Sequence, residues 1–259
     1  MYLAEHDVTG ELVAIKMLDP FFCDNAEIVR RLLAERAISE RVHDDGLLDV
    51  RSAGRTSAGV PYLVMEYLEG ETLQSLLDGG TVACDTLVAI AAQAAAALGA
   101  LHAAGFAHCD IKPANVFVLS RPGRDGQPRV KLIDFGAARS VDEPAASDCA
   151  IAGTPTYMAP EQWRGQPGLA SDVYSFGCML YEMSTGRPVF SGSLPYLMAS
   201  HRHRRPASPC THRPDLSSSI EQLILRALAK DPAQRPSAGE LAIELNRVLY
   251  AARPVAAAV

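Results

Sequence analysis

Short apolar and β-branched runs mark the beginning of the chain. Residues 12–18 and 62–67 form two such runs, and both predict β-strands. A third run at residues 2–4 is separated from the first by the turn-forming pair Thr9-Gly10, which indicates a hairpin. Between these strands, residues 26–42 carry apolar side chains near helical spacing and predict one helix.

After Gly70 the pattern changes to helical spacing. The predicted helices cover residues 72–77, 85–104, 171–185, 217–229 and 237–251, and short strands are predicted at 116–119 and 130–133. We therefore expect an α+β fold of two lobes. The small β-rich lobe covers residues 1–67, a hinge lies near 66–70, the larger helical lobe covers 68–250, and 251–259 is a flexible tail.

Composition and charge narrow the function classes. Of the 259 residues 48% are hydrophobic, which is enough for a sizeable core. A formal net charge of −6 argues against nucleic acid or an anionic membrane surface as a partner. The apolar stretch at 87–101 is short for a membrane span and is interrupted by Gln93 and Gly99, so it predicts a buried helix and no membrane insertion.

Cysteine spacing bears on the compartment. The six cysteines are scattered and none forms a C-x-x-C pair, which suggests neither a zinc site nor a disulfide framework. A reduced, cytoplasmic location is the simplest inference. The exception to the acidic balance is the run His201-Arg202-His203-Arg204-Arg205. We interpret it as a solvated surface loop, with a docking patch for an acidic partner as the alternative.

The strongest chemical signal is an ordered pair of motifs. An H-x-D-x-x-x-x-N segment at residues 108–115 is followed by the D-F-G tripeptide at 134–136. Together they resemble the catalytic loop and the metal-binding loop of protein kinases, and the chain is most similar to bacterial, eukaryotic-like serine/threonine kinases. Phosphoryl transfer needs a carboxylate near the attacking hydroxyl, oxygen ligands for magnesium, and cations on the phosphates.

The resemblance assigns a residue of this chain to each of these requirements. Asp110 would orient the substrate hydroxyl and accept its proton, and Lys112 would neutralise the γ-phosphate. Asn115 and Asp134 would hold Mg²⁺. The structural members of the two motifs are His108, Phe135 and Gly136.

The resemblance extends to the nucleotide side. Val13-Ala14-Ile15-Lys16 resembles the strand whose lysine contacts the α- and β-phosphates of ATP. Ala14 and Lys16 share one face of the strand, so the methyl group can meet adenine while the ammonium meets phosphate. Glu35 is the expected ion-pair partner of Lys16, with Glu40 as the alternative.

The expected hinge is Met65-Glu66-Tyr67-Leu68, which resembles the family's gatekeeper and hinge. Backbone groups of Glu66 and Leu68 would hydrogen-bond the adenine edge. Phe117 would form the floor of the adenine site with Ala14, and it is equally a core aromatic.

Further residues complete a resemblance that covers residues 1–250 as one kinase domain. Thr154 resembles the threonine that contacts the catalytic aspartate and lysine. Glu161, in an A-P-E motif, needs a buried partner, and Arg235 stands where the family places that arginine. Asp172 resembles the acid that anchors the backbone of the catalytic loop.

Two departures from the family pattern affect the expected activity. The pattern G-x-G-x-x-G-x-V would end at Met1, so we expect the glycine-rich loop to be missing and ATP binding to be weak. A start codon assigned too late and a truncated gene with a weak or dead product are both open explanations. Cys109 replaces the arginine that normally pairs with a phosphorylated activation loop, so loop phosphorylation should matter less here.

The leading hypothesis is an ATP- and Mg²⁺-dependent serine/threonine protein kinase of bacterial signalling. The alternative is a pseudokinase that acts as a scaffold or allosteric partner without useful catalysis. A kinase of small molecules is disfavoured by Thr154 and the A-P-E segment, which resemble a peptide-docking architecture. Some bacterial relatives dimerise through the small lobe, so the resemblance leaves a homodimer open.

Overall fold

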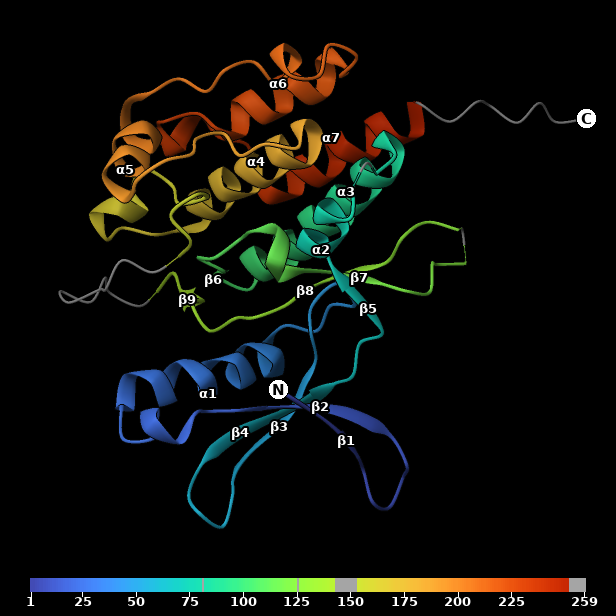
Figure 1. Ribbon diagram of the computed structural model, residues 1–259, viewed down its shortest axis with the longest axis vertical. Helices are drawn as coiled ribbons and strands as arrows, with labels where there is room; N and C mark the ends of the chain where they lie inside the picture. The colour runs from blue at the N-terminus through green and yellow to red at the C-terminus, as the bar shows by residue number, and fades with distance from the viewer. Residues whose placement is uncertain (81, 125, 143–152, 252–259) are drawn as a thin grey trace, which may run out of the picture.

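The small lobe is an antiparallel sheet packed against one helix. The computed structural model describes residues 1–80, 82–124, 126–142 and 153–251. The four strands lie in the order β1-β2-β4-β3, and α1 packs against β3 and β4 (Figure 1). These elements are β1 (Tyr2–Glu5), β2 (Leu12–Met17), α1 (Ala26–Arg41), β3 (Val50–Arg55) and β4 (Pro61–Glu66), with a 3₁₀ turn at Pro20–Phe22.

The large lobe is built around helices, with short strands facing the small lobe. Its helices are α2 (Leu73–Asp78), α3 (Cys84–Ala103), α4 (Leu169–Thr185), α5 (Leu194–His203), α6 (Ser218–Ala227) and α7 (Ala238–Ala251). Its strands are β5 (Gly70–Thr72), β6 (Phe106–Ala107), β7 (Val116–Leu119), β8 (Val130–Leu132) and β9 (Arg139–Ser140), in the sheets β5-β7-β8 and β6-β9. Short 3₁₀ turns lie at Pro113–Asn115, Gln162–Arg164, Pro209–Thr211 and Pro232–Gln234.

The predicted α+β fold of two lobes is confirmed. The predicted helices all occur, with ends shifted by at most two residues, and so do the strands at 12–18, 62–67, 116–119 and 130–133. The sequence analysis missed α5, β3 and the short strands β5, β6 and β9. Residues 252–259 of the expected tail lie outside the described residues.

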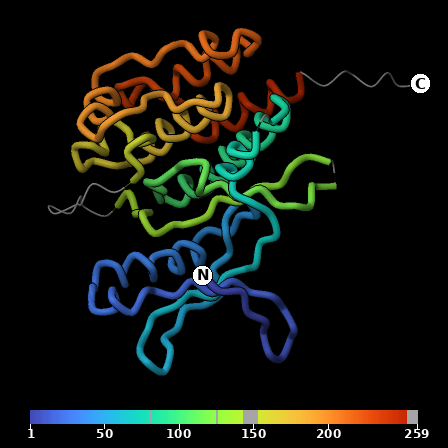
Figure 2. Tube along the Cα trace, viewed as in Figure 1, coloured from blue at the N-terminus to red at the C-terminus, as the bar shows by residue number. Residues whose placement is uncertain are grey.

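The two lobes are joined by buried hydrogen bonds beside the hinge. Lys131 of β8 is 8% exposed, and its Nζ lies 2.6 Å from Glu66 Oε1 and 3.0 Å from the carbonyl oxygen of Leu47. The backbone amide of Leu48 also donates to the carbonyl of Leu132 at 2.9 Å. The connection between α1 and β3 is therefore attached to the large lobe, as the chain trace shows (Figure 2).

Glycine is required where the chain enters the large lobe. Gly70 has a φ of 151°, and a Cβ placed on it would lie 2.0 Å from the carbonyl oxygen of Val118. Both conditions exclude a side chain, so β5 can pair closely with β7 only with glycine at this position.

α3 is the helix that the apolar run at 87–101 predicts. At 20 residues it is long and apolar enough to cross a membrane by length and composition alone. The expectation that this segment is too short for a membrane span was therefore wrong. Its burial is the stronger argument, because Ile90, Leu98 and Leu101 are fully enclosed in the core and α3 packs along α7 and α4. The predicted buried helix is confirmed.

The basic run at 201–205 is not a surface loop throughout, because His201 ends up in the core. α5 includes its first three residues, and His201 is 0% exposed. Its Nδ1 lies 3.1 Å from the hydroxyl of Tyr174, to which Lys230 donates at 2.8 Å. Burial, together with the charge of Lys230, lowers the pKa of His201 to about 4. His203, Arg204 and Arg205 remain exposed.

We expect His201 to make the large lobe sensitive to mild acid. In the unfolded chain its imidazole takes up a proton near the ordinary pKa of 6.5, whereas in the folded chain it takes up the proton only near its lowered pKa of about 4. Stability is therefore intact above pH 6.5 and falls as the pH drops toward 4, by at most about 3 kcal/mol. Urea unfolding at several pH values measures this loss.

The control is His201→Gln, which keeps an acceptor for Tyr174 but does not titrate. The variant should lose less stability than the unaltered chain over the same pH range. Equal losses in the two proteins would show that other groups cause the acid sensitivity.

Candidate active site

A cavity of about 270 Å³ lies between the lobes at the end of β4. The predicted residues Ala14, Met65, Glu66, Leu68 and Phe117 all line it, together with Met1, Tyr2, Leu3, Leu48, Tyr67 and Ile133. Strand register brings them together, because Ala14 pairs with Leu3 on one side and with Met65 on the other. The sequence analysis missed Leu48, which carries no motif, and Ile133, whose place directly before Asp134 was an available signal.

Lys16 follows the lining residue Ala14 by two positions on β2 and lies between two carboxylates. Its Nζ is 2.7 Å from Glu35 Oε1 and 2.9 Å from Asp134 Oδ1. Glu40, the alternative partner, lies 2.8 Å from Arg36 instead. Although burial alone would lower the pKa of Lys16, the charges of Glu35 and Asp134 raise it above its ordinary value. Lys16 is therefore cationic at neutral pH.

The two carboxylates differ in environment. Burial raises the pKa of Glu35 despite the opposing charge of Lys16, and its Oε2 is buried without a hydrogen-bond partner in the described part of the chain. The side chain of Asp134 is 47% exposed, and although partial desolvation raises its pKa, the charge of Lys16 beside it holds the pKa below the ordinary value. A Cβ on Gly136 would lie 3.2 Å from Glu35 Oε1 and 3.3 Å from Asp134 Oδ1, so glycine leaves room for both.

A second cluster faces the cleft from the large lobe. Asp110 Oδ2 lies 2.6 Å from the ammonium of Lys112, and Asp110 Oδ1 accepts from the hydroxyl of Thr154 at 2.8 Å. Lys112 also donates to the Thr154 hydroxyl at 2.9 Å. The amide of Asn115 donates to the Asp110 carbonyl at 2.8 Å and to its Oδ2 at 3.2 Å. The structure therefore brings all the predicted catalytic residues into one hydrogen-bonded group.

The backbone of the catalytic loop is held from α4. Asp172 is 1% exposed, and its carboxylate accepts from the amides of His108 and Cys109, each at 2.7 Å. Its Oδ2 also lies 2.8 Å from Nε2 of His102, a contact the sequence analysis missed. Cys109 has a φ of 65°, which costs a non-glycine residue about 1–2 kcal/mol. Asp172 stabilises this strained geometry.

The ring of His108 connects the two predicted motifs. Its Nδ1 accepts from the amide of Asp110 at 3.4 Å, so Nε2 carries the hydrogen that it donates to the Ile133 carbonyl at 3.3 Å. The ring also packs against Phe135, with 5.4 Å between centroids. Phe135 is 1% exposed.

Glu161 and Arg235 form a buried, bidentate ion pair. The two guanidinium nitrogens lie 2.6 and 2.9 Å from the two carboxylate oxygens. Ser171 donates to Glu161 at 2.7 Å, and Arg235 donates to three backbone carbonyls, so both charges are well satisfied. These bonds hold the pKa of Glu161 below its ordinary value against the effect of burial.

Two oxygen groups suit Mg²⁺ by their chemistry. Asn115 uses its amide nitrogen on Asp110, and in the described part of the chain nothing donates to its Oδ1. Asp134 has a φ of 64° and engages Lys16 through Oδ1, which leaves Oδ2 as a ligand. Mg²⁺ prefers such hard oxygen donors, with phosphate and water as the remaining ligands. The residues present therefore fit the ion.

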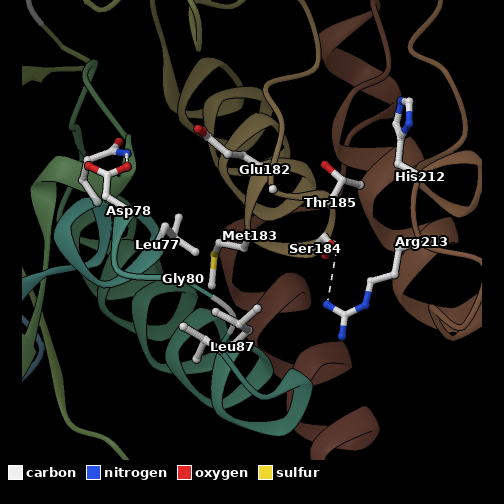
Figure 3. A pocket seen from close by; sticks show the side chains of 13 residues that line it. Leu77, Asp78, Gly80, Leu87, Glu182, Met183, Ser184, Thr185, His212 and Arg213 are labelled. Carbon is white, nitrogen blue, oxygen red and sulfur yellow. Dashed lines mark hydrogen bonds between the residues drawn. The ribbon is translucent and has the colours of Figure 1, made fainter.

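A second cavity, of about 470 Å³, opens between α2, the start of α3 and the end of α4. Asp78 and Glu182 lie at one end, and His212 and Arg213 at the other (Figure 3). Glu182 accepts from the hydroxyl of Tyr157 at 2.5 Å, and burial raises the pKa of its carboxyl. Carboxylates repel phosphate, so the smaller cavity beside Lys16 is the better nucleotide site despite its size.

Comparison with known proteins agrees with this geometry. The pattern that defines the protein kinase domain matches residues 1–244. The chain is 37% identical over 240 residues to the serine/threonine-protein kinase Pkn1 of Myxococcus xanthus, covering 91% of this chain and 34% of that protein. It is 35% identical over 246 residues to the serine/threonine-protein kinase PknB of Mycobacterium tuberculosis, covering 91% and 38%. The chain thus spans little more than a third of these relatives.

A solved structure is also similar. The kinase domain of PknI from Mycobacterium tuberculosis superimposes with a TM-score of 0.71 at 26% identity, covering 96% of this chain and 89% of that one.

We expect Arg235→Met to lower the free energy of unfolding by about 3–5 kcal/mol, because it leaves the charge of Glu161 buried and unpaired. The double variant Arg235→Met with Glu161→Gln should recover more than half of the loss. Arg226→Met is the matched control, since Arg226 and Glu244 form an exposed pair worth about 1 kcal/mol or less. Urea unfolding measures all of them, and equal losses for Arg235→Met and the control would contradict the expectation.

Proposed function

Because the chain belongs to the protein kinase domain family, we propose that it transfers the γ-phosphate of ATP to serine or threonine hydroxyls of protein substrates. The observation that carries the proposal is the hydrogen-bonded group of Asp110, Lys112 and Thr154, placed opposite Lys16 and Asp134. The relatives named serine/threonine-protein kinases support the choice of acceptor. The proposed catalytic unit covers residues 1–250.

The nucleotide would lie with its base in the cavity lined by Ala14, Met65 and Phe117. Lys16 supplies a cation for the phosphates, and Glu35 keeps that cation in place at 2.7 Å. Asn115 and Asp134 would hold Mg²⁺, which when bound neutralises charge on the phosphate oxygens.

Asp110 would receive the substrate hydroxyl. Both of its carboxylate oxygens already accept hydrogen bonds, from Thr154 on one side and from Lys112 and Asn115 on the other. Its main contribution would be to orient the hydroxyl, and it takes the proton late in the transfer. Lys112 lies close enough to stabilise the phosphoryl group as it moves.

We place the catalytic unit in the cytoplasm, where ATP is available. The free thiols of Cys23, Cys84, Cys178 and Cys210 are consistent with a reducing compartment.

Asp110→Asn should reduce phosphate transfer from Mg-ATP to a generic acceptor protein such as casein by about 100-fold or more. The variant keeps the shape of the side chain, and it lies away from the cavity that would hold the base. Nucleotide binding, measured by calorimetry, should therefore stay within about threefold. Turnover that survives in this variant would overturn the catalytic assignment of Asp110.

Lys16→Met should lower kcat/KM for ATP by about 100-fold, because the phosphates lose their positioned cation. The control is Arg36→Met, which removes a cation from the same small lobe but from the outer pair with Glu40. Steady-state kinetics with varied ATP separates the two variants. Similar losses in both would indicate that general destabilisation of the lobe, and not phosphate contact, causes the effect.

A further inference from the structure

A buried amide side chain joins the catalytic loop to the segment that follows the A-P-E motif. Nε2 of Gln162 donates to the carbonyl of Cys109 at 2.9 Å, and its Oε1 accepts from the backbone amide of Ala159 at 2.9 Å. Gln162 is 3% exposed. Both ends of the amide are therefore used on backbone groups, one of them directly before Asp110 in the chain.

The carbonyl that Gln162 binds belongs to the strained residue of the loop. Cys109 has a φ of 65°, in the left-handed region that a residue with a Cβ rarely adopts. Its amide is held by Asp172 at 2.7 Å and its carbonyl by Gln162, so the peptide groups on both sides of the strained φ are hydrogen-bonded. Without one of these bonds, Cys109 would relax toward negative φ and turn the backbone of Asp110.

Residues 153–154 belong to the activation segment, which ends at the A-P-E motif, and they lie directly over this hydrogen bond. A Cβ placed on Gly153 would lie 3.0 Å from the Cys109 carbonyl oxygen and 3.3 Å from Gln162 Nε2. The next residue, Thr154, is the one that donates to Asp110. The position of residues 153–154 and the bond from Gln162 to Cys109 therefore depend on each other.

We infer that Gln162 is a positioning residue for phosphoryl transfer. It holds Cys109 in the left-handed conformation and thereby aims the carboxylate of Asp110 while the activation segment is seated. The inference rests on the proposed catalytic role of Asp110. The sequence analysis gave Gln162 no role of its own, because its function comes from a backbone carbonyl 53 residues away.

The test uses two variants of similar size in the full chain. Gln162→Met removes both hydrogen bonds, and Gln162→Glu, while ionised, keeps an acceptor for Ala159 but cannot donate to Cys109. Both should lower kcat by about 10–100-fold and leave KM for ATP within about twofold. Gln166→Met is the control, since Gln166 is exposed on the same segment and should change neither constant. Full kcat in a folded Gln162→Met protein would overturn the inference.

A rescue experiment separates positioning from simple packing. Cys109→Gly accepts a positive φ without steric cost, so the loop no longer needs Gln162 to hold its conformation. Gln162→Met should then cost no more than about threefold in kcat when made in the Cys109→Gly background. An equal loss in the two backgrounds, measured on proteins with matched thermal unfolding curves, would show that Gln162 acts through packing alone.

Amide hydrogen exchange tests the inference independently of activity. Gln162→Met should speed exchange in the peptide at residues 108–112 by about tenfold or more and leave exchange in α4 unchanged. Unchanged exchange in that peptide would overturn the positioning role even if no phosphate transfer were detected. Absence of transfer in the unaltered chain would count against the proposed function instead.

Discussion

The carboxylate of Asp172 is the contact on which the architecture of the site depends. It is enclosed at the start of α4, yet it satisfies two backbone amides of the catalytic loop and lies within hydrogen-bond distance of His102. A buried charge is tolerable only when its acceptor sites are occupied, so the helix and the loop need each other. The largely buried helix α4 thereby helps to determine where Asp110 points.

Charge also links the lobes. Lys16 comes from the small sheet, Glu35 from α1 and Asp134 from the large lobe, so a single ammonium group on β2 connects α1 with the large lobe. The hinge contributes a second link through Lys131 and Glu66. The pair at the hinge has no part in the proposed chemistry, whereas the ammonium group of Lys16 is the proposed cation for the phosphates.

The sequence predicted the two lobes, most helices and the groups that converge on the cleft, because these depend on local periodicity and on short motifs. It did not predict α5 or the burial of His201, because a run of histidine and arginine resembles solvated chain until the surrounding rings are known. It also missed Lys131, Leu48 and Gln162. Each of these acts on a backbone group or cavity wall supplied by a distant segment, and such contacts leave no pattern along the chain.

The pairing of Glu66 with Lys131 has a consequence for molecular evolution. The one carboxylate among the hinge residues 65–68 is turned toward the large lobe, so under the proposed function the hydrogen bonds of the hinge to a base would come chiefly from main-chain groups. Main-chain groups are present whichever amino acids occupy the hinge. Hydrogen bonding to a base would then survive substitution at the hinge, whereas Met65, Tyr67 and Leu68 line the cavity and stay constrained by its shape.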